Sequence, residues 1–150
     1  MKLQWNIKDW SSLTTDELYD ILALRIEVFV IEQNCPYQDA DGKDKKSRHL
    51  FAMNQDGAYV ACLRIVQPRV SYEEISIGRV VTSPKLRGTG IGKELMQRAI
   101  DIITQEGNPP VRISAQSHLQ KFYEGFGFVK VSEEYLEDDI PHVEMLRSQR

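Results

Sequence analysis

Cysteine is scarce in this sequence, which has only Cys35 and Cys62 among its 150 residues. Two cysteines that are not spaced as a Cys-x-x-Cys pair exclude a disulfide scaffold and fit a reducing compartment. Long apolar runs are also absent, so no segment is expected to span a bilayer. The first ten residues mix charges and tryptophans where a secretory signal needs an apolar stretch. We therefore expect a cytoplasmic protein with no membrane partner.

An excess of positive charge is missing as well. The sequence has 19 lysine and arginine residues against 22 acidic residues, which gives a net charge of -3. Nucleic acid is not an expected partner, because neutralising its phosphates requires a basic face. The length and the ordinary proportions of 41% hydrophobic and 27% charged residues predict a single domain over residues 1–150.

Hydrophobic periodicity predicts strands that alternate with helices. A capping box at Thr14 and Glu17 precedes a helical period that runs from Leu18 to Phe29. Two further helices are expected at 91–103 and 117–126. Strands are expected at 2–7, 49–53, 58–66, 74–82, 111–115, 127–131 and 142–146, with an acidic loop between the last two. This order predicts a mixed sheet with helices on its faces.

Three local features carry more specific predictions. The Asp56-Gly57 pair predicts a hairpin, and Gly78 inside a strand predicts a β-bulge or a close approach of another backbone. Arg25 interrupts an apolar helix face, and we expect it to form an internal ion pair with an acidic residue or to bind the cofactor. The stretch DADGKD does not predict a calcium loop, because Gly42 comes too early and Leu50 stands where a bidentate glutamate is needed. Three isolated histidines give no zinc spacing, so no metal is expected.

The glycine-rich stretch RGTGIGK, residues 87–93, follows a predicted strand and opens a predicted helix. Unpaired N–H groups at a helix N-terminus, together with glycines, allow the backbone to bind an anion closely. A Walker loop is excluded, because it needs glycine at position 87 and Ser or Thr at 94, where Arg87 and Glu94 stand. The dinucleotide fingerprint is excluded because it needs glycine at position 93, which is Lys93.

The remaining pattern, Arg-x-x-Gly-x-Gly over residues 87–92, resembles the pyrophosphate-binding signature of the GNAT superfamily of N-acetyltransferases. The stretch LQKFYEGFGF, about thirty residues later, is similar to the second signature of that family. Four other segments are similar to its ElaA-like branch, so that the resemblance covers almost the whole chain: LRIEVFVIEQNCPYQDADGKD, SRHL, IGRVV and IPHVEM.

This resemblance implies an α/β (α+β) GNAT fold. Its central sheet is mixed and mostly antiparallel, with six to seven strands, helices on both faces and a V-shaped splay between two parallel strands, here 75–82 and 111–115. The resemblance also implies acetyl-CoA as co-substrate. The pantetheine arm would pair with the backbone of Val80, Val81 and Thr82, and Gln116 replaces an asparagine that contacts the cofactor in many relatives. The pyrophosphate would bind N–H groups of Arg87, Gly88, Thr89, Gly90, Ile91, Gly92 and Lys93.

Acetyl transfer needs a neutral amine nitrogen and a proton for the departing thiolate. The resemblance places Tyr123 near the cofactor sulfur, and a phenol with a reference pKa of about 10 can donate at pH 7. Glu32, His49 and Glu74 are candidates for the base. Each also has a structural interpretation: a solvated carboxylate for Glu32, a packing residue for His49, and an orientation toward the opposite sheet face for Glu74.

These features predict an enzyme that transfers acetyl from acetyl-CoA to a primary amine, either a small molecule or a protein. Direct attack in a ternary complex is expected, because neither cysteine has a basic neighbourhood in the sequence. The acidic stretches EEYLEDD and YQDADGKD are expected to form an electronegative rim or simply solvated surface. Two alternatives stay open: a non-catalytic acyl-CoA-binding regulatory module, and an acyl-homoserine-lactone synthase, to which LRIEVFVIEQ is similar. The final hairpin could pair with a second copy in a homodimer.

Overall fold

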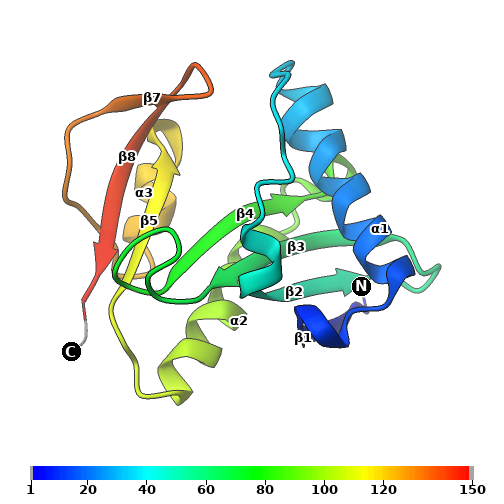
Figure 1. Ribbon diagram of the computed structural model, residues 1–150. Helices are drawn as coiled ribbons and strands as arrows, with labels where there is room; N and C mark the ends of the chain where they lie inside the picture. Colours follow the sequence, from blue (N-terminus) through cyan, green and yellow to red (C-terminus); the bar gives the residue numbers. More distant parts are fainter. Residues whose placement is uncertain (1, 149–150) are drawn as a thin grey trace.

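The computed structural model describes residues 2–148. Strands and helices alternate along the first part of the chain, and strands dominate its end (Figure 1). The strands are β1 (Gln4–Asp9), β2 (Ser47–Met53), β3 (Tyr59–Val66), β4 (Ser76–Thr82), β5 (Val111–Gln116), β6 (Val129–Lys130), β7 (Tyr135–Glu137) and β8 (Ile140–Arg147). The helices are α1 (Thr15–Arg25), α2 (Ile91–Gln105) and α3 (Gln120–Glu124), with a π-helix η2 (Ile26–Glu32). Short 3₁₀ turns are η1 (Trp10–Ser12), η3 (Lys43–Lys46), η4 (Pro84–Leu86) and η5 (Ser117–Leu119).

The strands form two antiparallel sheets that meet at one point. The first sheet has the order β1-β2-β3-β4, and in the second β8 lies between β5 on one side and β6 and β7 on the other. A parallel bridge between Ile75 and Val111 joins them, and the Arg112 amide donates to the Ile75 carbonyl at 3.0 Å. Beyond this bridge β4 and β5 diverge, as Figure 1 shows. The predicted V-shaped splay of two parallel strands is therefore confirmed.

The sequence did not predict β7, which lies in the segment interpreted as an acidic loop. β7 forms a hairpin with β8 through Asp138 and Asp139, both of which have positive φ angles, 50° and 61°. A two-residue turn with two positive φ values is the common hairpin connection, and aspartate tolerates it. The Asp-Asp pair between Leu136 and Ile140 was the available local signal for this hairpin.

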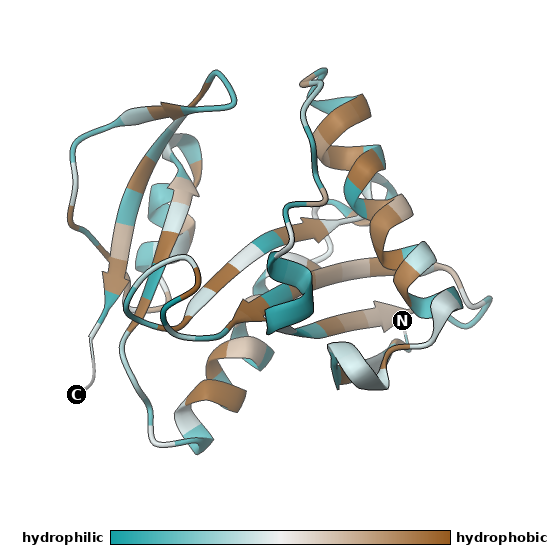
Figure 2. Cartoon of the chain, viewed as in Figure 1, coloured by the Kyte–Doolittle hydropathy of each residue, from teal (hydrophilic) through white to brown (hydrophobic). Residues whose placement is uncertain are grey.

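Helices cover both faces of the first sheet, as expected. Ile21, Leu24 and Val28 pack against the face formed by Phe51, Cys62 and Val81. Strand residues with the opposite parity point to the other face, against α2. These core residues include Leu50, Ala52, Ala61, Leu63, Leu95, Met96 and Ala99. Figure 2 shows hydrophobic residues along α1 and α2, the two helices that cover this sheet.

The first helix begins at the predicted capping box. The Thr14 hydroxyl accepts from the Glu17 amide at 3.0 Å, and the Glu17 carboxylate accepts from the Thr14 amide at 2.9 Å. After Arg25 the helix widens into η2, whose last turn has hydrogen bonds from Gln33 to Val28 and from Cys35 to Val30. Such π-helical turns occur frequently at functional sites.

The predicted bulge lies in β4. Gly78 pairs with Arg64 and Val81 pairs with Cys62, so Arg79 and Val80 together face one residue of β3. Arg79 has a φ angle of 50°, a left-handed conformation that is uncommon for a residue with a side chain. The bulge bends the edge strand at the point where the two sheets separate.

Among residues 2–148, no helix is long and apolar enough to cross a membrane.

Candidate active site

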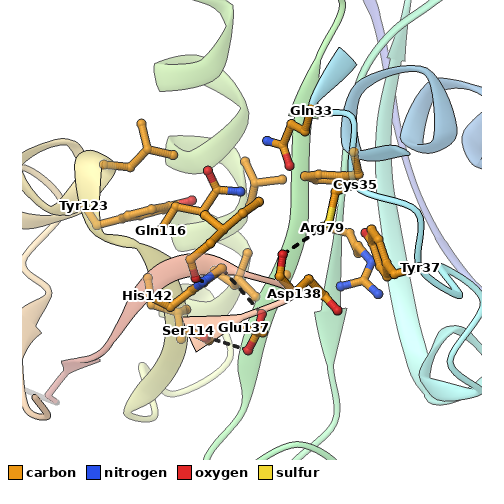
Figure 3. Close-up of a pocket in the computed structure, with 17 residues that line it drawn as sticks. Gln33, Cys35, Tyr37, Arg79, Ser114, Gln116, Tyr123, Glu137, Asp138 and His142 are labelled. Atoms are coloured by element: carbon orange, nitrogen blue, oxygen red, sulfur yellow. Dashed lines mark hydrogen bonds and ion pairs between the residues drawn. The ribbon is translucent and has the colours of Figure 1, made fainter. Parts of the chain in front are cut away.

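A cleft occupies the splay between the two sheets. It encloses about 700 Å³ of empty space, counting its open mouth, and its walls come from η2, the following loop, β4, β5, α3 and the β7–β8 turn. Figure 3 shows two sides: Gln116, Tyr123, His142 and Ser114 on one, and Cys35, Arg79 and Tyr37 on the other. The Cys35 thiol donates to the Asp138 carbonyl at 3.2 Å and links these sides. The splay therefore creates a site that includes residues more than one hundred positions apart.

Tyr123 lines the cleft from α3. Only 7% of the residue is exposed, and its ring packs edge-on against Phe122 and Phe128. Burial raises the pKa of Tyr123 to about 12, because a desolvated phenolate is unfavourable. The hydroxyl therefore keeps its proton at every pH at which the fold is expected to function.

The other residues predicted to contact the pantetheine arm or the cofactor do not all point into the cleft. Val80 and Gln116 line the cleft with Tyr123. Val81 is buried on the opposite side, in the core beneath α1, because side chains alternate along β4. Val81 can therefore offer only its backbone to a ligand in the cleft. Thr82 ends β4 close to Gly92, where an added Cβ would lie 3.9 Å from the Thr82 methyl.

The glycine-rich turn connects β4 to α2. Gly88 and Gly90 have φ angles of 81° and 83°, and an added Cβ on either would have no neighbour within 4 Å. Gly90 is the N-cap of α2, so the first amides of this helix have no acceptor within it. The described turn therefore combines open space, a positive helix end and backbone donors, as an anion site requires.

Glu32 pairs with the turn rather than with the cleft. Arg87 Nη1 donates to Glu32 Oε2 at 2.8 Å, and a second hydrogen bond joins Nη2 to Oε1. The hydrogen bond with Arg87 lowers the pKa of Glu32. Glu32 is absent from the described lining of the cleft. We do not retain it as the base, because its carboxylate is already engaged by a cation at the cofactor turn.

His49 also lies outside the cleft. It is 1% exposed in β2, and its Nε2 lies 2.9 Å from the Asp44 carbonyl. A carbonyl only accepts, so Nε2 donates here. Glu74, the third candidate, is held by Arg112 Nε at 3.0 Å. Both residues therefore have structural partners, and neither is among the described residues that line the cleft.

The burial of His49 makes stability depend on pH. Burial lowers the pKa of His49 from its ordinary 6.5, so the folded protein binds this proton less readily than the unfolded chain. The contribution of neutral, buried His49 to the free energy of unfolding is therefore complete above about pH 6.5 and declines as the pH falls below 6.5. His49→Gln, which keeps the donor to Asp44, should lose less unfolding free energy than wild type between pH 7 and pH 5. Urea denaturation at both pH values measures this, and equal losses would contradict it.

Arg25 forms the predicted internal ion pair, within a larger network. Its guanidinium contacts Asp44 Oδ1 at 2.8 Å and Asp39 Oδ2 at 2.9 Å. Burial would raise the pKa of Asp44, but hydrogen bonds and charge from Arg25 and Arg64 hold that pKa below its ordinary value. Arg79 Nε donates to Asp39 Oδ1 at 2.8 Å and thereby ties the bulge to the loop.

The same network engages one of the two stretches that were expected to form an electronegative rim or a solvated surface. The carboxylates of YQDADGKD are paired with arginines, as in the contact of Asp41 with Arg64 at 2.6 Å. The other acidic stretch contributes Glu137 and Asp138 to the cleft wall. Sequence reasoning did not assign functions to Glu137, His142 or Ser114. His142 is the pairing partner of Gln116 across β8 and β5, a relationship between distant segments with no local signal.

Comparison with known proteins agrees with this geometry. The model of the acetyltransferase (GNAT) domain matches residues 16–148. Protein ElaA of Escherichia coli (strain K12) is 43% identical over 148 residues, which cover 97% of this chain and 96% of ElaA. An acyl-CoA N-acyltransferase from Pseudomonas aeruginosa has a crystal structure that matches with a TM-score of 0.92 and 47% identity, over 98% of this chain and all of that chain. The crystal structure of Escherichia coli ElaA matches with a TM-score of 0.91 at 42% identity, over 98% of this chain and 100% of that chain. The chain belongs to the GNAT acetyltransferase family, whose general reaction is acyl transfer from coenzyme A to an amine.

Proposed function

We propose that this protein is a cytoplasmic N-acetyltransferase that moves acetyl from acetyl-CoA to a primary amine, on a small molecule or a protein. The observation that carries the proposal is the arrangement of three features around one cleft. The edge of β4 diverges from β5, the glycine-rich turn follows β4 directly, and Tyr123 lines the cleft. An edge strand offers unpaired backbone groups to an extended ligand. The edge of β4 thus suits the amide-containing pantetheine arm, and the turn suits its pyrophosphate.

The reaction requires stabilisation of the departing thiolate. Tyr123 supplies a proton donor inside the cleft, and its partly apolar surroundings strengthen a hydrogen bond to a developing negative charge. The backbone amides beside the β4 bulge can polarise the thioester carbonyl. Gln116 lines the same wall and offers an amide group to the cofactor.

Direct attack by the amine is favoured over a cysteinyl intermediate. Cys62 is buried in the core, and burial raises its pKa to about 12. Cys35 does line the cleft, but its thiol donates to the Asp138 carbonyl, so its proton is in use. A nucleophilic cysteine needs to be a thiolate. These placements support a ternary complex of enzyme, acetyl-CoA and amine.

Substitution of Gly90 tests the cofactor site. Gly90→Glu places a carboxylate in the open space of the turn, whereas Gly90→Gln has the same size and the same strain at a φ of 83° without the charge. Repulsion from the pyrophosphate should make CoA binding about 10- to 100-fold weaker in Gly90→Glu than in Gly90→Gln. Calorimetric titration with CoA and acetyl-CoA measures this ratio. Gly57→Glu, with a φ of 82° in the β2–β3 turn, controls for backbone strain and an added charge away from the glycine-rich turn.

An amine library assayed for CoA release then tests transfer. Turnover with a primary amine supports the acetyltransferase, and inhibition by adenosylmethionine would instead favour the homoserine-lactone synthase alternative. Binding of acetyl-CoA without turnover of any amine would favour a non-catalytic module. If the folded wild type does not bind CoA, the proposed cofactor site is wrong.

A further inference from the structure

The proposed reaction has no assigned general base, because Glu32, His49 and Glu74 are engaged by other partners. An alkyl amine with a reference pKa of about 10.4 reaches the enzyme mostly as an ammonium ion at pH 7. It must lose a proton before it attacks, so a proton acceptor has to face the cleft. The inference that follows rests on the proposed acetyl transfer, because only that reaction requires a proton acceptor in the cleft.

We propose that His142 is the general base of this reaction and that Glu137 positions it and conducts the proton toward solvent. His142 lines the same cleft as Tyr123 and Gln116. Figure 3 shows all three on one side of the cleft, with Glu137 next to His142. The acid and the base would thus approach the reacting atoms from one wall.

The hydrogen bonds of His142 determine which ring nitrogen is available. Its Nδ1 lies 2.6 Å from the Ile140 carbonyl, which can only accept, so the Nδ1 position carries the hydrogen. In the neutral ring, Nε2 therefore holds the lone pair, which a base requires. Nε2 lies 3.4 Å from Glu137 Oε2, where a carboxylate stabilises the imidazolium formed on proton uptake.

Neighbouring side chains restrain both groups. The Ser114 hydroxyl donates to Glu137 Oε1 at 3.1 Å and lies 2.5 Å from the Tyr135 hydroxyl. The Tyr135 ring stacks on His142 with centroids 6.2 Å apart and an interplanar angle of 23°. The side chain of His142 is 8% exposed and that of Glu137 is 46% exposed. The pair therefore connects a shielded nitrogen to a solvent-exposed carboxylate.

Other ionisable groups surround this pair and enter any pH profile. They come from β7, the β7–β8 turn, α3, β8, the loop before β4 and the opposite wall of the cleft: Tyr135, Asp138, Tyr123, Glu144, Tyr72, Cys35 and Arg79. Arg79 is paired with Asp39, and the Cys35 thiol donates to a carbonyl. Burial raises the pKa values of both Tyr123 and Tyr135. The two phenols therefore keep their protons near neutral pH.

The proton balance of the step is complete without a further reactant. One ammonium proton passes to His142 Nε2, and the neutral nitrogen forms a bond with the thioester carbon. When the carbon–sulfur bond breaks, the thiolate takes the proton of the Tyr123 hydroxyl. The second proton lost by the nitrogen returns to the Tyr123 oxygen, and His142 releases its proton through Glu137 to water. The products are the amide, free CoA and one proton.

The decisive variant is His142→Asn. Asparagine keeps a donor at the Nδ1 position for the Ile140 carbonyl but has no titratable nitrogen. At pH 7, kcat/KM for the amine should fall about 10²- to 10⁴-fold, while the calorimetric affinity for CoA stays within about twofold. The deficit should shrink as the pH approaches the pKa of the amine, because a neutral amine needs no base. Glu137→Gln should lower kcat/KM for the amine less than His142→Asn does, and its kcat should be below that of wild type. His118→Asn, at an exposed histidine on η5, should match wild type.

Each outcome decides the proposal. A deficit that shrinks with rising pH, together with ¹⁵N shifts that show an Nδ1–H tautomer for neutral His142, supports it. Unchanged turnover in His142→Asn, or a deficit equal at every pH, overturns the base assignment and leaves the acetyltransferase intact. If wild type binds CoA but transfers acetyl to no amine, the proposed function fails and the base assignment fails with it.

Discussion

Replacing Tyr123 with phenylalanine should lower kcat about 10²- to 10⁴-fold, the typical contribution of a positioned proton donor. The variant loses only the hydroxyl, and its ring keeps the edge-on contacts with Phe122 and Phe128. The affinity for CoA and the unfolding midpoint should therefore change little. Steady-state kinetics with saturating acetyl-CoA measures the first effect, and calorimetry with urea denaturation measures the others.

The pH profile adds a sharper test of Tyr123. Because burial raises its pKa to about 12, the hydroxyl stays protonated where an exposed tyrosine, with a pKa of about 10, would already be half ionised. Wild-type kcat should consequently show no decline from loss of this proton up to pH 10. Tyr19→Phe, at a tyrosine that is 75% exposed on α1, should behave as wild type. Full activity of Tyr123→Phe would show that the thiolate is protonated by another route.

Replacing Arg25 with methionine should destabilise the fold by about 3–5 kcal/mol, the usual result of removing one partner of a buried ion pair. Arg25 is 1% exposed and contacts both Asp39 and Asp44, which are 7% and 6% exposed. Methionine fills a similar volume, so the loss comes mainly from two buried carboxylates that keep only Arg64 and Arg79 as cationic partners. Urea denaturation at pH 7 measures the unfolding free energy.

The sign of the pH dependence distinguishes this mechanism from lost packing. The arginines hold the pKa of Asp44 below its ordinary 3.8, so their stabilisation is complete above that pH and is lost as the pH falls further. The difference between Arg25→Met and wild type should narrow under those acidic conditions. Arg69→Met removes an ion pair whose side chains are both 81% exposed and should cost at most about 1 kcal/mol. Equal effects of the two substitutions would contradict the buried-network account.

The buried ion-pair network reaches the cleft at the bulge of β4. Arg79 keeps a φ of 50° while its guanidinium contacts Asp39, which also contacts Arg25. The core network therefore reaches the wall of the cleft through one aspartate. A destabilised loop in Arg25→Met would loosen that wall as well as the core beneath α1.

Features that depend on a few neighbouring residues were readable from the sequence. The capping box at Thr14 and the bulge beside Gly78 were predicted from such residues and are present. The splay of two strands is also present, but it was implied by the family resemblance. The β7–β8 hairpin was missed because its charged residues show no clear alternation. The π-helical widening after Arg25 was also missed, since its residues keep an apolar pattern that a regular α-helix would share.

The sequence by itself determined the family resemblance, most of the order of elements and the glycine-rich turn before α2, because motifs, periodicity and caps depend on residues close together in the chain. Only the tertiary structure decided the roles of the ionisable residues. It paired Glu32 with Arg87 at a separation of 55 residues, buried His49 beneath a loop, and placed His142 beside Glu137 in the cleft. The reason is physical: a side chain's hydrogen-bond partners and solvent access depend on which sheet face it occupies and on what packs against that face, and these are set by contacts between distant segments.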